Sequence, residues 1–477
     1  MRILITVLLL AGATACMSQD FSDQFNQFKT GNERAYDKLV RQRDSIFAKS
    51  IVDNWKSLQL EQPEEKIAEE PKPEAQPVAE PSLELMEVQH KVIADERPKL
   101  MRSFNQPKLE YDEEYDDFEK VESYEFHGES ISLRYSAQFL SANDLSVSDE
   151  FGLSKAWQTL SRSPYQNIVK SLYEKAQEMN LPDYGYLLLT ESFLDQLNIS
   201  EAHKPVYQWF LLQKSGYVAR VGLINKKPVL VIGCYGKIYG KRFYSQSGVN
   251  YYVLSDVPGQ FESFQSETSE ESNLFDFSLS SEIKLPLDPI KKNFNYLQKS
   301  GKDVSIDIYF NQNMVEMLGD FPQCDLRYYL TSSSSDLMKK SVQKSFEIHM
   351  TGKSEVERVQ FLLEFVQKAI DYQSDKIQFG KEKVMYPEEV LFYDFADCDD
   401  RVVLLNYLIK TFTDVPVVVV SFPQHVALAV RLPSPTFGET ISYKGYTFTF
   451  CDPTYLNSPL GSVIPQADRS KIEVIEF

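Results

Sequence analysis

The chain has 477 residues, 43% of them hydrophobic, which is enough for two or three domains with substantial cores. Its 69 acidic residues outnumber the 50 basic ones, and the net charge of −19 argues against a nucleic-acid-binding protein, which needs a basic surface. Five cysteines over this length do not make a disulfide framework, and five histidines show no metal-ligand spacing. We therefore expect neither a metal nor a cofactor, and few residues remain for Cys- or His-based catalysis.

Residues 1–18 have the pattern of an export signal peptide. Arg2 supplies the charged start, residues 3–11 form an apolar run too short for the roughly 20 residues that span a bilayer, and small residues follow. Cleavage before Cys16 would resemble a bacterial lipoprotein signal and tether the protein to a membrane, whereas cleavage near Ser18 would release it. Both sites remain open, and either one predicts a location in the periplasm, at the cell surface or outside the cell.

Two segments precede the first folded region. In residues 19–60 aromatic residues such as Phe21, Phe25 and Phe28 recur at helical spacing, which predicts one or two amphipathic helices. Their polar face is mixed in charge, so packing on the body or on another copy is favoured over a membrane role. Residues 61–118 are rich in Pro and Glu and predict an extended, self-repelling linker.

The rest of the chain predicts an α+β protein. Residues 119–260 mix helical and strand-like stretches, and residues 261–340 form a β-rich connecting region that includes VSIDIYF (304–310) and LRYYLT (326–331) as candidate strands. After a boundary near 340, residues 341–477 contain an amphipathic helix, a second helix and three strands, which we expect to pair as an antiparallel sheet packed on the second helix.

Cys398 lies at the predicted start of that second helix. Asp397 is a natural N-cap, and it places Cys398 at the first helical position. Backbone N–H groups and the helix dipole favour a thiolate there, and the amide of Cys398 could hold an oxyanion. The acidic residues beside Cys398 oppose ionisation of the thiol. A positive partner is therefore needed, and His425 is the obvious candidate.

His425 and Asp452 lie on two of the predicted strands. His425 begins one strand and shares its face with two alanines, while Asp452 ends the following strand. Antiparallel pairing of these strands would place Asp452 beside His425, where it could orient the ring and stabilise its charged form.

The order Cys398, His425, Asp452 resembles the core of the transglutaminase-like superfamily of papain-type cysteine enzymes. The strings PEEVL (387–391) with CDDR (398–401), QHVAL (424–428) and FCDPT (450–454) are similar to the family's motifs, and they span about residues 345–465. The resemblance implies that Cys398 is the nucleophile, His425 the general base and acid, and Asp452 the orienting carboxylate. It also implies an acyl-transfer reaction on a protein or peptide substrate, either hydrolysis of an amide or Gln–Lys transamidation.

Several alternatives remain open at this point. Family members often carry Gly where this chain has Ala396, and the second oxyanion donor is not identifiable, with Gln373, Tyr393 and the end of the preceding helix as candidates. A chain that keeps the fold but lacks chemistry would be a binding or scaffold protein of the cell envelope. The remaining thiols in the folded regions are expected to be structural: Cys234, Cys324 and Cys451.

Residues 205–256 have the same order of helix and strands as residues 401–454. Asp256 falls at the place of Asp452 and the thiol position falls near Ala202 and His203, whereas no His occupies the corresponding strand. We interpret residues 119–260 as a possible degenerate, non-catalytic copy of the C-terminal unit. Different strand orders in the two units would contradict this hypothesis.

Overall fold

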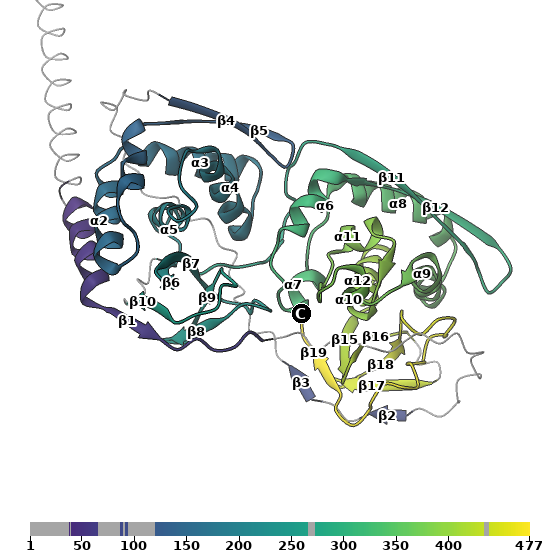
Figure 1. Ribbon diagram of the computed structural model, residues 1–477. Coiled ribbons are helices and arrows are strands. Elements are labelled where there is room, and N and C mark those ends of the chain that lie inside the picture. Colours follow the sequence, from purple (N-terminus) through teal and green to yellow (C-terminus); the bar gives the residue numbers. More distant parts are fainter. Residues whose placement is uncertain are drawn as a thin grey trace, which may run out of the picture.

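The computed structural model describes residues 38, 40–64, 86–88 (backbone only), 91–93, 120–265, 272–433 and 438–477. These residues form a mixed α+β structure with antiparallel, curled sheets, arranged as two units side by side (Figure 1). The predicted signal peptide 1–18, including Cys16, lies outside the described residues. None of the helices in the described residues is both long and apolar enough to cross a bilayer.

The N-terminal unit packs helices on an antiparallel sheet. The hairpin of β4 (Lys120–Phe126) and β5 (Glu129–Tyr135) is followed by η1 (Ala137–Asp144) and four helices, α2 (Glu150–Ser161), α3 (Gln166–Glu178), α4 (Asp183–Gln196) and α5 (Lys204–Lys214). The five strands that follow are β6 (Ala219–Ile224), β7 (Lys227–Cys234), β8 (Phe243–Gln246), β9 (Val249–Val253) and β10 (Phe261–Phe264). Helix α5 packs on β6 and β7.

A helix over residues 40–53 joins this unit from upstream. Its backbone accepts a hydrogen bond at Ala48 from Ser154 of α2, 2.6 Å long, and its Asp44 forms a buried ion pair with Lys214 of α5. The prediction of helix up to residue 60 was wrong at its end, because Trp55–Leu58 forms strand β1 on the edge of β10. Residues 19–37 of that predicted segment lie outside the described part of the chain.

The C-terminal unit starts with the hairpin of β11 (Pro289–Leu297) and β12 (Asp303–Asn311). Helices α6 (Gln312–Gly319), α7 (Leu326–Leu330), α8 (Asp336–Met350) and α9 (Glu355–Ala369) follow, and the hairpin packs on α8 and α9. The unit therefore begins upstream of the boundary predicted near 340. The candidate strand LRYYLT was also wrong: it forms α7, because the Asp325 side chain accepts from the Arg327 N–H and caps a helix.

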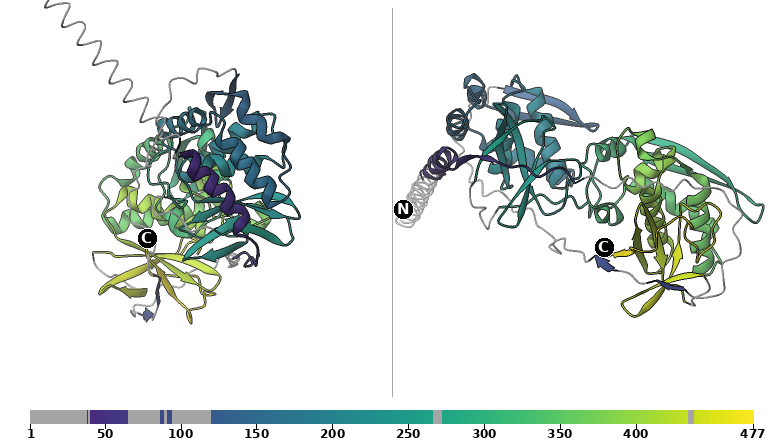
Figure 2. Two further views of the ribbon diagram at one scale, coloured as in Figure 1. Left: turned by 90° about the vertical axis from the view of Figure 1, so that its left-hand side faces the viewer. Right: turned by 60° about the horizontal axis from the view of Figure 1, so that its bottom comes forward.

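Helix α12 (Cys398–Phe412) is the buried centre of the C-terminal unit. Two short strands, β13 (Asp371–Tyr372) and β14 (Phe395–Ala396), and two short helices, α10 (Asp375–Gln378) and α11 (Pro387–Phe392), lead to it. The helix packs on α9, α11 and β16. The sheet beneath it contains β15 (Val417–Phe422), β16 (His425–Val430), β17 (Glu439–Tyr443), β18 (Tyr446–Cys451) and β19 (Glu473–Ile475). Figure 2 shows this sheet from two further sides.

Five strands follow the same order in the six-stranded sheet of the N-terminal unit and in the seven-stranded sheet of the C-terminal unit. The order β10-β6-β7-β9-β8 in the N-terminal unit matches β19-β15-β16-β18-β17 in the C-terminal unit, and these neighbours are all antiparallel. Each unit also begins with a hairpin and continues with helices. The hypothesis of an internal copy is supported by this shared order.

The predicted linker contributes two strands to the C-terminal sheet. β2 (Met86–Val88) pairs with β17 and β3 (Lys91–Ile93) pairs with β19, both in parallel. Only two residues separate β2 from β3, yet their partners stand at opposite ends of the strand order, so the sheet curls until its ends meet across this segment. The sequence from residue 83 to 93 is richer in apolar residues than the Pro/Glu stretch before it, which explains why it can pair.

Candidate active site

Cys398 is the first residue of α12, as its sequence context predicts. Asp397 occupies the N-cap position with extended backbone angles, and its N–H donates to the carboxylate of Asp400 at 3.4 Å. The thiol therefore lies at the positive end of a 15-residue helix, where backbone N–H groups favour negative charge. Its side chain is completely buried.

His425 is held at the start of β16 by a tight hairpin. Residues Pro423 and Gln424 connect β15 to β16, and Gln424 adopts the left-handed conformation (φ 64°) that such a two-residue turn requires. This turn places Phe422 opposite His425, and their rings stack with centroids 5.9 Å apart. The imidazole is 1% exposed.

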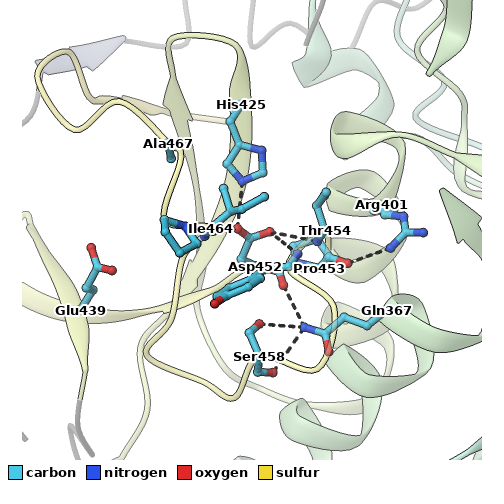
Figure 3. A network of polar contacts seen from close by, with 12 residues as sticks. Gln367, Arg401, His425, Glu439, Asp452, Pro453, Thr454, Ser458, Ile464 and Ala467 are labelled. Atoms are coloured by element: carbon cyan, nitrogen blue, oxygen red, sulfur yellow. Dashed lines mark hydrogen bonds and ion pairs between the residues drawn. The ribbon is translucent and has the colours of Figure 1, made fainter. Parts of the chain in front are cut away.

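Asp452 follows directly after β18 and binds His425. The sheet pairs β16 with β18 in antiparallel fashion, and Oδ2 of Asp452 lies 2.9 Å from Nε2 of His425 (Figure 3). Oδ2 also accepts from the Ile464 N–H at 2.9 Å, while Oδ1 accepts from the N–H groups of Thr454 and Tyr455 at 2.9 and 3.2 Å. The carboxylate thus accepts four hydrogen bonds.

These contacts fix the protonation states of the pair. Burial alone would raise the pKa of Asp452, but the charge and hydrogen bond of His425 and the backbone N–H groups lower it, and the net result is a pKa below the ordinary value. An ionised Asp452 requires the proton of the neutral imidazole to be on Nε2. Nδ1 is then the ring nitrogen that can accept a proton from a thiol.

Two further side chains fasten the Asp452 turn to the helices. Gln367 of α9 donates to the Asp452 carbonyl at 3.0 Å and to Ser458, and it is almost fully buried (Figure 3). Arg401 of α12 donates to the carbonyl oxygens of Ala396, Pro453 and Ile370 at 3.2, 3.2 and 2.7 Å. Because Arg401 is one helical turn from Cys398, it ties the thiol's helix to the turn that holds Asp452.

Arg401 is the positive charge that the sequence reasoning missed. Burial lowers the pKa of its guanidinium, whereas Cys398, Tyr372, Asp397 and Asp452 raise it in their ionised forms. This cation therefore lies within the field of both the sulfur and the Asp452 carboxylate. His425 is therefore not the only positive partner for a thiolate. The signal was present in CDDR: position i+3 of a helix lies on the same face as its first residue.

Buried carboxylates surround the start of α12 on another side. The ligand oxygens of Asp397, Asp399 and Asp400 lie within 4.8 Å of one another, as do those of Asp375, Glu382 and Asp397. Burial raises the pKa of Asp397 well above its ordinary value, and the adjacent carboxylates raise it further. A cluster of this kind either shares protons or holds a hard cation, since oxygen ligands are those that Ca²⁺ prefers.

The two residues that are candidates for a second oxyanion donor lie on the loops that lead to Cys398. Gln373 is half-buried and follows β13, whereas Tyr393 packs its ring against Phe379 and under the Lys383 ammonium. The neighbour of Gln373, Tyr372, pairs with Ala396 in the β13–β14 bridge, two residues before the thiol. Sequence reasoning did not single out Tyr372.

The other thiols of the described residues have no such surroundings. Burial raises the pKa values of Cys234, Cys324 and Cys451, which favours their protonated, unreactive forms. Cys451 packs in the main hydrophobic core, on the opposite strand face from Asp452.

The N-terminal unit carries different residues at the positions of the triad. Its β6–β7 hairpin matches the β15–β16 hairpin, which places Lys227 where His425 lies, and the pairing of β7 with β9 places Ser255 at the position of Asp452. Helices α5 and α12 are each followed by a strand, β6 or β15, after four residues. When the two helices are aligned at their last residues, Ser200 falls at the position of Cys398. This unit therefore lacks a Cys-His-Asp set.

No family model, curated protein or solved structure matches the chain.

Proposed function

We propose that the chain is a cysteine-dependent acyl-transfer enzyme whose C-terminal unit belongs to the transglutaminase-like type. The observation that carries this proposal is the His425–Asp452 pair, in which the Asp452 carboxylate accepts four hydrogen bonds. His425 begins strand β16, and this strand packs on helix α12, whose first residue is Cys398. In the proposed reaction Nδ1 of His425 takes the thiol proton and the thiolate attacks an amide carbonyl. A thioester forms as the amine leaves with that proton, and water or a second amine resolves it.

The charges around Cys398 support this assignment. The helix N-terminus, Arg401 and a protonated His425 favour a thiolate, whereas the flanking acidic residues oppose it. The raised pKa of Asp397 weakens that opposition, because a protonated carboxyl carries no charge. Burial of Cys398 and the carboxylates of Asp399 and Asp400 still oppose ionisation of the thiol, so the proposal requires the helix N-terminus, Arg401 and His425 together to outweigh them.

The thiol's pH dependence tests the proposal. The rate of Cys398 alkylation by iodoacetamide, followed by intact-protein mass spectrometry from pH 5 to 10, should have a midpoint below the value of about 8.5 for a free thiol. His425→Gln should shift that midpoint upward, and Cys398→Ser should abolish labelling at this site. An unshifted midpoint in the native protein, or no effect of His425→Gln, would exclude the triad.

The rival function is that of a binding or scaffold protein that keeps the fold without turnover. The triad-free N-terminal unit and the long linker are compatible with it. A mass-spectrometric screen of envelope proteins for cleaved or isopeptide-linked products, comparing native protein with Cys398→Ala, separates the two. Products that appear equally with Cys398→Ala would favour the scaffold.

We further propose that the protein is exported and acts on protein or peptide substrates in the periplasm, at the cell surface or outside the cell. The support is the leader-like sequence of residues 1–18. Mass spectrometry of the mature N-terminus tests it: acylated Cys16 would show a membrane tether, and a free N-terminus near Gln19 would show release. An intact Met1 would contradict export through this signal.

A further inference from the structure

Tyr372 lies beside the thiol because three separate contacts place it there. β13 pairs in parallel with β14, and Tyr372 is the partner of Ala396 in this bridge. The preceding Ile370 carbonyl accepts from Arg401 at 2.7 Å, and the Arg401 guanidinium carbon lies 5.5 Å from the centre of the Tyr372 ring. The backbone of Tyr372 is thereby fixed to the first turn of α12.

The hydroxyl of Tyr372 is directed at the reacting sulfur. Its pKa is raised above the ordinary value by burial, then by Cys398 and Asp397 in their ionised forms, and by a hydrogen bond with Cys398. A raised pKa keeps the phenol protonated, so that it acts as a donor at neutral pH. Tyr372 is half-buried, whereas Cys398, His425 and Asp452 are buried, so it lies at the boundary between the thiol and solvent.

We propose that the Tyr372 hydroxyl is the side-chain oxyanion donor for acyl transfer at Cys398. This inference rests on the proposed function and deepens it. When the sulfur forms its bond to the carbonyl carbon, the π electron pair moves onto the oxygen. That oxygen then accepts hydrogen bonds from the Tyr372 O–H and the Cys398 N–H at the start of α12. The pair returns as the C–N bond breaks, His425 delivers its proton to the leaving amine, and Tyr372 keeps its own proton throughout.

Two reactions of the same thiol separate this role from a structural one. Alkylation by iodoacetamide displaces iodide at a saturated carbon and forms no oxyanion, whereas acylation by p-nitrophenyl acetate passes through one. Tyr372→Phe keeps the ring and removes the donor. We expect Cys398-dependent release of p-nitrophenolate to fall about 10²-fold, as for loss of one oxyanion donor, with alkylation changed less than about threefold.

Tyr309→Phe is the matched control, since it removes an exposed phenol from β12 that has no place in the candidate site and should leave the ratio of the two rates unchanged. If the acylation rate and the alkylation rate of Tyr372→Phe fall by the same factor, as they would in a misfolded variant, the inference is overturned. An unchanged acylation rate would overturn it as well. If native Cys398 lacks His425-dependent alkylation, the proposed function itself fails. If alkylation of native Cys398 does depend on His425, but the ratio of acylation to alkylation rates in Tyr372→Phe equals that of the native protein, only the proposed role of Tyr372 fails.

Discussion

The substitution Asp452→Asn separates the structural contribution of the carboxylate from the catalytic contribution that the proposed function assigns to it. An Asn amide can keep its oxygen at the position of Oδ1, where it still accepts from the N–H groups of Thr454 and Tyr455. Its NH₂ group then replaces Oδ2 and faces two donors, the Ile464 N–H and the Nε2–H of His425. The hydrogen bonds of Oδ1 are therefore kept, whereas at the position of Oδ2 a donor group faces two other donors.

The magnitude of the effect depends on how the imidazole responds. If Nε2 keeps its proton, two hydrogen bonds to a charged group are lost, at about 1.5–3 kcal/mol each. If the proton moves to Nδ1, the amide can donate to Nε2, and only the bond from Ile464 is lost. The second arrangement costs less, so we expect the free energy of unfolding to fall by about 1.5–3 kcal/mol. That arrangement also removes the lone pair on Nδ1 that would accept the thiol proton.

The assay therefore measures stability and reactivity on the same variant. Urea unfolding gives the change in free energy, and iodoacetamide labelling at pH 7 gives the alkylation rate of Cys398, which should fall on the order of 10²-fold. Asp468→Asn, at an exposed carboxylate that bonds only locally to Ser470, is the control and should change neither. A variant with the expected loss of stability but an undiminished alkylation rate would refute this reasoning.

The stability difference should also depend on pH. The pKa of Asp452 is lower in the folded than in the unfolded protein, so its stabilisation is complete above the unfolded value of about 3.9 and is lost as the pH falls through the folded value. The gap between native protein and Asp452→Asn should therefore narrow as the pH falls below 4. A gap that widens below pH 4 would contradict an ionised Asp452.

Three other substitutions test separate parts of the fold. Arg401→Met removes a buried cation and its three carbonyl contacts, and it should lower the free energy of unfolding by about 3–5 kcal/mol. Arg358→Met, which loses one carbonyl contact and a partly exposed ion pair with Glu355, should lower it by about 1 kcal/mol. Equal losses in urea unfolding would count against the role of Arg401. Asp397→Asn should raise the melting temperature at pH 8 in EDTA and leave it unchanged at pH 4, because the raised pKa of Asp397 makes its ionisation destabilising. A lower melting temperature at pH 8 without chelator would instead show a bound cation. Lys91→Pro removes the Lys91 N–H bond to Ile472, 2.9 Å long, and should cost about 1 kcal/mol and speed proteolysis of the linker relative to Lys91→Ala. Identical proteolysis rates would show that β3 is not held in solution.

The local parts of the candidate site were predictable from the sequence. Asp397 as a helix cap, His425 after a two-residue turn and Asp452 at a strand end each depend on a few neighbouring residues. The pairing of β16 with β18 is less local, because β17 lies between them in the chain and pairs on the other side of β18. By contrast, Arg401 and Tyr372 gain their roles from contacts with segments that are distant in sequence. The spacing of apolar residues along the sequence does not indicate that the Arg401 side chain donates to the Pro453 carbonyl.

The errors in the fold have similar causes. LRYYLT has the composition of a strand, but the cap at Asp325 and burial of Tyr328 and Tyr329 favour a helix. The pairing of β3 with β19 joins residues about 380 positions apart, and three residues of strand carry no pattern that specifies such a partner. Composition was sufficient to identify the Pro/Glu stretch as a linker, but it could not show that β2 and β3 after this stretch pair with the C-terminal sheet.

The burial of Cys398 makes its chemistry dependent on motion. A thiol with no exposed surface can meet a reagent or a substrate only in conformations that open the site, so every observed rate is the intrinsic rate multiplied by the fraction of molecules that are open. Comparing alkylation by small and bulky reagents would measure how far the site opens. If the protein is exported as proposed, burial would also protect the sulfur from oxidants that convert an exposed thiol to sulfenic acid and beyond. Under the proposed function, the closed form would preserve the nucleophile until a substrate displaces its cover.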